Sequence, residues 1–240
     1  MITVPEAFTK FQRRLEATDA EERSASSRQK KLREQLDASA IGIDRDFLAG
    51  SYRRETKTKP LRDVDIFEVL ADTSYLDKHP SKVLNDVKDV LEPHYPGRVC
   101  TDRRAVRVDF GVTLIEDTSD EVMSFDIVPA FADGSTYLIP DDETGKWIRT
   151  NPEVHAIKAT DANKAYDKTW KPLVKMVKKW NAHNGDPIEP SFLLEVMALD
   201  IFRGSWGGSY PRELRMFFAD GAARIGERLG GPRGSGARRQ

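Results

Sequence analysis

Cysteine and histidine, on which much metal and nucleophilic chemistry depends, are rare in this sequence. Its 240 residues include one cysteine, Cys100, and four histidines. A single cysteine excludes an intramolecular disulfide and a cysteine cluster for zinc. The histidines are scattered without the spacing of metal ligands. The sequence therefore disfavours a zinc site and a histidine-centred catalytic triad.

Long apolar runs and an excess of charge of one sign are also absent. Mean hydropathy is −0.56, and no run approaches the ~18 apolar residues of a membrane-spanning helix. The first 24 residues mix acids with bases and contain no apolar core of a secretory signal, so we expect a cytoplasmic protein without a membrane partner. The 38 basic and 39 acidic residues leave a net charge of −1, so any site for a polyanion must be local.

Hydrophobic periodicity predicts helices and strands in the first two thirds of the chain. Residues 5–38 combine apolar residues at helical spacing with strong helix formers, which predicts one long helix with a break near 24–27. Further expected elements are strands at 63–70, 105–115 and 122–131 and a helix at 81–91. The turn EDTSDE between the last two strands is too short for a crossover, so the sheet should be mixed and largely antiparallel.

From about residue 160 the pattern predicts helices alone. Residues 170–180 place an apolar stripe beside a stripe of lysines expected on a solvated face, and FLLEVMALDIF (192–202) is apolar nearly all round, which predicts a buried helix. We therefore expect an α/β (α+β) fold with two lobes. A catalytic lobe would span 1–158, with its long N-terminal helix bridging both lobes. A shortened helical lobe would span 159–229, followed by a disordered tail at 230–240.

Two aspartates in the strand at 63–70 are candidate metal ligands. Asp63 and Asp65 are two residues apart, so both side chains project from one face, roughly 6.6 Å apart along the strand. Carboxylates placed in this way bridge the pairs of magnesium ions used in phosphoryl and nucleotidyl transfer. Asp126, on a neighbouring strand, is the best candidate for a third ligand, and Asp109 is the second choice.

A lone pair of aspartates is more often a solvated edge of a sheet, so the argument depends on what precedes it. Gly50 and Ser51 end the segment before the basic loop 53–62. A tight turn there offers backbone N–H groups and a hydroxyl, which a triphosphate needs as donors. The combination of turn and carboxylates predicts a nucleotide site.

With these residues in place, the sequence resembles the polymerase-β-type nucleotidyltransferase superfamily. Gly50-Ser51-Tyr52, Asp63-x-Asp65 and Asp126, within Phe125-Asp126-Ile127-Val128-Pro129, carry the resemblance. Within the superfamily the chain is similar to the CD-NTases, bacterial relatives of cyclic GMP-AMP synthase and 2′-5′-oligoadenylate synthetase. Members of that branch continue beyond the position of Leu229, which is why the helical lobe is expected to be shortened.

The resemblance implies a bilobal nucleotidyltransferase with a role for each matched position. Asp63, Asp65 and Asp126 would be the catalytic ligands of Mg²⁺ or Mn²⁺. Nucleotide-binding residues would be Gly50 and Ser51, together with Lys178 and Ser191 of the helical lobe. The implied reaction joins nucleoside triphosphates into a cyclic or short linear second messenger, in bacterial antiphage signalling, with pyrophosphate released and with an activator protein among the expected partners.

Two other functions stay open at this stage. An RNA-terminal nucleotidyltransferase would use an extended basic track, of which the cluster Arg98, Arg103, Arg104 and Arg107 is a candidate fragment. A non-catalytic nucleotide-binding module is disfavoured because clustered carboxylates without a metal destabilise a fold. Base preference, linkage, ring size and oligomeric state are not encoded in any local pattern.

Overall fold

The computed structural model describes residues 1–112 and 122–229 as two compact units. One, which we call the sheet unit, comprises residues 11–160, and the other, the helical unit, comprises residues 1–10 and 161–240. The turn expected at 116–121 and the tail expected at 230–240 lie outside the described residues. No helix in the described ranges is long and apolar enough to cross a membrane.

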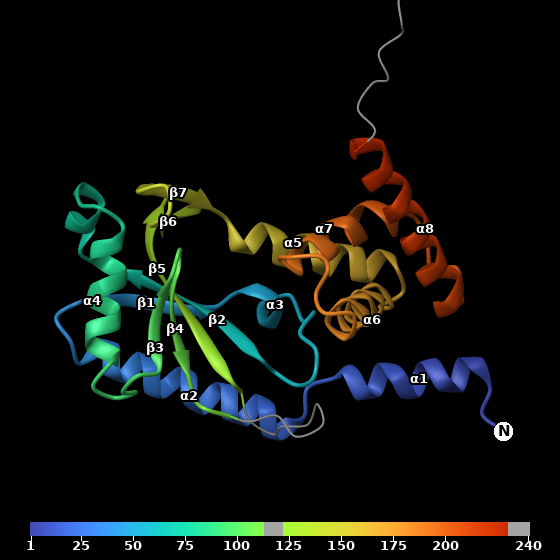
Figure 1. The fold of residues 1–240 in the computed structure, drawn as a ribbon, viewed down its shortest axis with the longest axis horizontal. Helices are drawn as coiled ribbons and strands as arrows, with labels where there is room; N and C mark the ends of the chain where they lie inside the picture. The colour runs from blue at the N-terminus through green and yellow to red at the C-terminus, as the bar shows by residue number, and fades with distance from the viewer. Residues whose placement is uncertain (113–121, 230–240) are drawn as a thin grey trace, which may run out of the picture. The chain divides into compact units, whose positions relative to one another are not determined.

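The described residues of the sheet unit form a seven-stranded sheet, whose strands are labelled in Figure 1. They are β1 (Ile43–Leu48), β2 (Asp63–Leu70), β3 (Val99–Asp102), β4 (Ala105–Asp109), β5 (Ser124–Asp133), β6 (Thr136–Asp141) and β7 (Lys146–Thr150). The order is β1-β2-β5-β4-β3, and β6 and β7 extend from β5 as an antiparallel meander. Among the described strands, only β2 and β5 pair in parallel. The expected mixed, largely antiparallel sheet is therefore confirmed.

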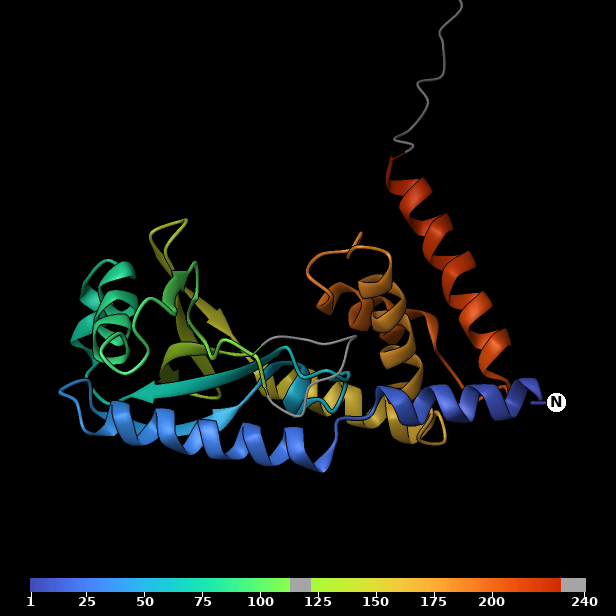
Figure 2. The ribbon, with the colours of Figure 1, turned by 60° about the horizontal axis from the view of Figure 1, so that its bottom comes forward.

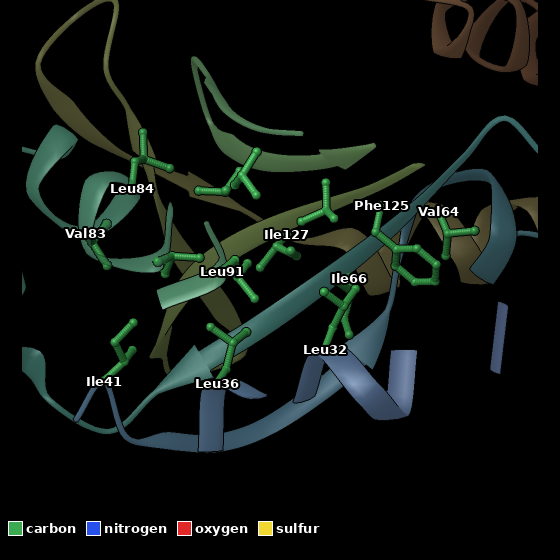
Figure 3. Close-up of a cluster of buried hydrophobic side chains, with 14 of the residues drawn as sticks. Leu32, Leu36, Ile41, Val64, Ile66, Val83, Leu84, Leu91, Phe125 and Ile127 are labelled. Carbon is green, nitrogen blue, oxygen red and sulfur yellow. The ribbon is translucent and has the colours of Figure 1, made fainter. Parts of the chain in front are cut away.

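Helices α2 (Asp19–Asp37) and α4 (Ser81–Leu91) pack against one face of this sheet. Figure 2 shows α2 running alongside β2. The apolar stripe of α2 contributes Leu32, which points toward Ile66 of β2 in Figure 3, and both side chains are fully buried. The sequence-based bounds of β2 and α4 are confirmed, because a β-branched run and a helical apolar stripe are local signals. Shorter elements of this unit are α3 (Gly50–Arg53) and the 3₁₀-helix η1 (Thr73–Asp77).

β2 is buried on both faces, which explains its nearly continuous apolar sequence. Val64 and Ile66 point into the core under α2 and α4. Phe67 and Val69 point the other way, into a second cluster with Val128 of β5. Because side chains alternate along a strand, Asp63 and Asp65 lie on the face of this second cluster.

The prediction of one long helix over residues 5–38 is wrong. The chain forms α1 (Val4–Leu15) and α2, and the break falls at 16–18 rather than at the serines near 24–27. Thr18 caps α2: its hydroxyl accepts a hydrogen bond from the Glu21 N–H, and the Glu21 carboxylate accepts one from the Thr18 N–H. This reciprocal capping box stops the helix from running through.

Other expectations are corrected at the level of element bounds. β4 ends at Asp109 instead of continuing through Val112, and β5 runs two residues beyond Phe131. The sequence did not lead to a prediction of β1, β3, β6 and β7, which are short and lack strong alternation. The prediction also placed the start of the helices near residue 160, whereas α5 spans Pro152–Ala165.

The helical unit contains α6 (Trp170–His183), α7 (Phe192–Ile201) and α8 (Tyr210–Leu229). Trp170, fully buried, donates its indole N–H to the carbonyl of Ala198, which ties α6 to α7. The expectation of a buried helix at 192–202 is confirmed only in part. α7 packs against α6 and α8, but within the described residues Leu193 and Val196 remain 44% and 39% exposed.

One carboxylate of the sheet unit lies inside the core. Glu68 of β2 is fully buried, and within the described residues its two carboxylate oxygens have no hydrogen-bond partner. It pairs in register with Asp46 of β1, which Gln29 and Arg33 of α2 hold by hydrogen bonds. Burial, and secondarily the charge of Asp46, raise the pKa of Glu68 to about 8, while Arg33 opposes the rise.

Candidate active site

The strand register brings two of the predicted carboxylates side by side. Asp65 of β2 pairs with Asp126 of β5, and Asp63 pairs with Ser124. Neighbouring strands lie about 4.8 Å apart, and paired residues point to the same face. Asp109, the second choice for a third ligand, pairs instead with Ser124 from the far side of β5, and its carboxylate accepts the Gly111 N–H at 2.6 Å. Because β5 separates Asp109 from β2, Asp126 is the better candidate for the third metal ligand.

The glycine-serine turn lies directly against Asp65. The backbone N–H of Ala49 donates to the Asp65 carbonyl at 2.9 Å, which fixes the start of α3 beside β2. Gly50 has φ of 56°, and a Cβ added to it would lie 1.6 Å from Oδ2 of Asp65. Glycine is therefore required here twice, for its left-handed backbone and for the space that the carboxylate fills.

The basic loop that follows is partly engaged within the sheet unit. Lys57 forms an ion pair with Glu22 of α2 at 2.8 Å, and its ammonium lies 3.9 Å from the ring centroid of Tyr52. These contacts place Tyr52 and the loop against the end of α2. The loop thus belongs to the framework that holds the Gly50-Ser51 turn.

Asp126 has a partner that the sequence did not reveal. Arg107 of β4, which pairs with it in register, donates Nε–H to Oδ1 and Nη2–H to Oδ2, both at 2.8 Å. The hydrogen bonds to Asp126 are the main cause that raises the pKa of Arg107, and the charge of Asp63 adds to them. The side chain of Asp126 is only 15% exposed, so this ion pair is partly shielded from water.

The arginine cluster that suggested a basic track is divided among separate contacts. Arg103 and Arg104 both bind the buried carboxylate of Asp141 at the end of β6, and Arg98 donates to the carbonyl of Phe110. With Arg107 on Asp126, each of the four guanidiniums has an intramolecular partner. The structure therefore offers no support for a track built from these residues.

Lys178 and Ser191 belong to the helical unit. The ammonium of Lys178 lies 3.2 Å from the Glu195 carboxylate of α7, and their side chains are 11% and 3% exposed. Ser191 is exposed and stands at the N-cap of α7 without a side-chain capping bond. A solvated face, the alternative to a binding role for the lysines of α6, is wrong for Lys175, which is buried.

The three aspartates fit a divalent metal by residue type and strand position. Magnesium and manganese prefer carboxylate oxygens, and here they come from adjacent strands on one face. Among the described residues, however, no three histidine, cysteine or acidic side chains converge as a metal cage. The Asp65 carboxylate lies against Gly50, and Arg107 binds that of Asp126.

Comparison with known proteins assigns this arrangement to a family. The model of the Second Messenger Oligonucleotide or Dinucleotide Synthetase domain matches residues 1–163. The chain belongs to this family. Members of the second-messenger synthetase family are nucleotidyltransferases, and the resemblance seen in the sequence is thereby confirmed.

Two curated relatives and one solved structure illustrate the likeness to this synthetase family. A probable cyclic nucleotide synthase of Bacillus cereus (strain VD146) is 31% identical over 198 residues, which cover 70% of this chain and 59% of that protein. The cyclic AMP-AMP-AMP synthase of an Acinetobacter species is 31% identical over 162 residues, covering 63% and 44%. This chain thus spans about half the length of these relatives.

The CdnE cyclic dinucleotide synthase of Elizabethkingia meningoseptica, solved with GTP and Apcpp, has a TM-score of 0.70. It is 18% identical, and the match covers 95% of this chain and 86% of that one. At this identity the likeness shows the fold, a nucleotidyltransferase fold with a mixed sheet and helices. The predicted fold class is confirmed.

Proposed function

We propose that this chain is a metal-dependent nucleotidyltransferase that joins nucleoside triphosphates into a cyclic or short linear oligonucleotide second messenger. The observation that carries the proposal is the register of Asp65 with Asp126 beside the turn at Gly50, in a chain of the second-messenger synthetase family. We further propose that the sheet unit is the catalytic lobe and that the helical unit binds substrate. Bacterial antiphage signalling in the cytoplasm, with an activator protein, is the biological setting that this function implies.

In the proposed reaction, a ribose hydroxyl of one nucleotide attacks the α-phosphorus of another. An oxygen–phosphorus bond forms, the bond to the β-phosphate bridge breaks, and pyrophosphate leaves with that electron pair. The chemistry supplied by bound Mg²⁺ or Mn²⁺ is neutralisation of the triphosphate and a lower pKa of the attacking hydroxyl. Asp63, Asp65 and Asp126 would hold the metal, and Asp126 would also accept the hydroxyl proton.

The other predicted residues serve the donor triphosphate in this proposal. Gly50 lets the backbone lie close to the carboxylates, and the backbone N–H groups of the turn, with the Ser51 hydroxyl, would donate to phosphate oxygens. Lys178 and Ser191 of the helical unit would also contact nucleotide phosphates. Lys178 would do so as a point charge, which suits phosphate oxygens.

Free nucleotides are favoured over an RNA end as acceptor. The net charge is −1, and the arginines that suggested a basic track are engaged in contacts within the chain. Binding of long RNA depends on neutralising many phosphates in a row. A closed, locally basic site suffices for two nucleoside triphosphates.

The test incubates the purified chain with labelled ATP, GTP, CTP and UTP in Mg²⁺ or Mn²⁺, with and without added RNA. Products are treated with phosphatase and separated by chromatography. We expect a phosphatase-resistant product that Asp63→Asn/Asp65→Asn abolishes. An Asp133→Asn variant, changed at the far end of β5, is the matched control and should keep activity.

One result would overturn the proposal: products whose size follows the added RNA would identify an RNA-terminal nucleotidyltransferase. Nucleotide binding without any product, in both metals and with the full set of nucleotides, would point instead to a truncated, activator-dependent or non-catalytic form.

A further inference from the structure

Arg107, Asp126 and Asp65 form one row across the sheet. Arg107 of β4 pairs with Asp126 of β5, and Asp126 pairs with Asp65 of β2, so the three side chains share a face. Both carboxylate oxygens of Asp126 accept hydrogen bonds from the Arg107 guanidinium at 2.8 Å. Such a fork is the strongest pairing that arginine makes with a carboxylate, and it fixes the orientation of both groups.

The Arg107 guanidinium places a permanent positive charge on Asp126, one of the carboxylates that the proposed function assigns to a metal ion. Three aspartates on one face repel one another unless positive charge lies between or beside them. The Arg107 guanidinium supplies such charge, being hydrogen-bonded to Asp126 and close enough to Asp63 to feel its charge. It also holds both carboxylate oxygens of Asp126 from the side of β4.

We propose that Arg107 is a positioning residue that substitutes for the metal: it neutralises Asp126 and holds it toward β4 until a divalent cation competes for the same carboxylate. The inference rests on the proposed function, because it concerns the same carboxylates. The new element is that metal binding becomes an exchange, in which a divalent ion replaces the Arg107 guanidinium as the cation bound to Asp126. Arg107 then sets both the stability of the metal-free protein and the metal concentration that the enzyme requires.

The proposal predicts opposite effects of removing the charge. In Arg107→Gln the carboxylates repel without a counter-charge, so the metal-free protein should unfold at a lower temperature. A divalent ion no longer meets a neighbouring positive charge, so Mn²⁺ should bind about tenfold more tightly, which is about 1.4 kcal/mol. Saturating Mn²⁺ should therefore restore most of the lost stability.

The experiment measures Mn²⁺ affinity by isothermal titration and the unfolding temperature with and without saturating Mn²⁺, on the full chain. Arg107→Lys keeps the charge without the fork and should bind Mn²⁺ within about twofold of the wild type. Arg103→Gln is the matched control, because Arg103 makes the same two-pronged contact with Asp141 at 3.1 and 3.0 Å. Its loss of stability should be the same with and without Mn²⁺.

A second measurement uses the wild-type protein and needs no stable Arg107→Gln variant. The Arg107 Nε–H signal in a ¹⁵N NMR spectrum, assigned by its absence from Arg107→Lys, reports the hydrogen bond to Asp126. Saturating Mg²⁺ should increase its exchange with water several-fold. Unchanged exchange in a metal-bound protein would overturn the proposal.

The outcomes separate this inference from the proposed function. Equal or weaker Mn²⁺ binding by Arg107→Gln, with the same stability loss in both conditions, would show a purely structural ion pair and would leave the function intact. If neither the wild type nor Arg107→Gln bound Mn²⁺ at millimolar concentration, the metal-dependent function would itself be refuted, and this inference with it.

Discussion

Replacing Glu68 by glutamine should make the protein more stable at neutral pH and leave it unchanged in mild acid. Glu68 is fully buried, and within the described residues its carboxylate oxygens lack hydrogen-bond partners. Its pKa is raised from 4.5 to about 8, chiefly by burial. Between these values the folded protein keeps the proton that the unfolded chain releases, so stability falls as the pH rises.

The magnitude follows from the two pKa values. The stability slope is about 1.4 kcal/mol per pH unit between pH 4.5 and 8, so the whole window amounts to about 5 kcal/mol. Raising the pH from 4.5 to 7 therefore lowers the free energy of unfolding by about 3 kcal/mol. Glutamine does not titrate, so Glu68→Gln should gain about 3 kcal/mol at pH 7 and nothing near pH 4.5. For a chain of this size that corresponds to roughly 6–12 °C in unfolding temperature.

The assay is thermal unfolding of wild type and Glu68→Gln at intervals from pH 5 to pH 8. The difference between the two proteins is the quantity of interest, because other titrating groups are common to both. Glu153→Gln, on an exposed position of α5, is the control and should track the wild type. A difference that stayed constant from pH 5 to pH 8 would refute the argument, since it would mean that Glu68 is ionised in the folded protein throughout.

Two further substitutions test the local structure around the site. Thr18→Ala removes the hydroxyl that caps the start of α2 and should cost about 1 kcal/mol in urea unfolding; a loss below ~0.3 kcal/mol would mean that the cap does not stabilise this end of α2. Gly50→Ala should abolish binding of a labelled nucleoside triphosphate, because its Cβ would collide with Asp65. Gly42→Ala, also at positive φ but with nothing within 4 Å of its Cβ, should show only the backbone strain of about 1–2 kcal/mol and keep nucleotide binding; equal binding by both variants would contradict this account.

Several features of the fold could be predicted from the sequence because they depend on neighbours along the chain. The strand at Asp63–Leu70 and the helix at Ser81–Leu91 follow from apolar periodicity, and their bounds agree with the structure. The capping box at Thr18 was also visible, as threonine followed three residues later by glutamate. The prediction did not use this signal and placed the break of the first helix near residues 24–27 instead of at 16–18.

Other features had no local signal. The apolar composition of 192–202 predicted a buried helix, yet burial depends on which neighbours pack against α7, and Val196 remains 39% exposed. The arginines near β3 and β4 looked alike in the sequence. Their roles differ because Arg103 and Arg104 lie at the turn beside Asp141, whereas Arg107 faces Asp126 from within β4.

The sequence by itself determined that Asp63 and Asp65 share one face of a strand, since side chains alternate with a period of two. The turn expected at Gly50 and Ser51 is instead the start of the short helix α3. These residues, with the flanks of Asp126, were enough to indicate the family. Only the tertiary structure decided that Asp126 rather than Asp109 lies beside Asp65, that Arg107 holds Asp126, and that Glu68 is sealed in the core. The physical reason is that pairing register and burial join segments about 20 to 60 residues apart along the chain, so they are set by packing of the whole sheet unit and leave no trace in local spacing.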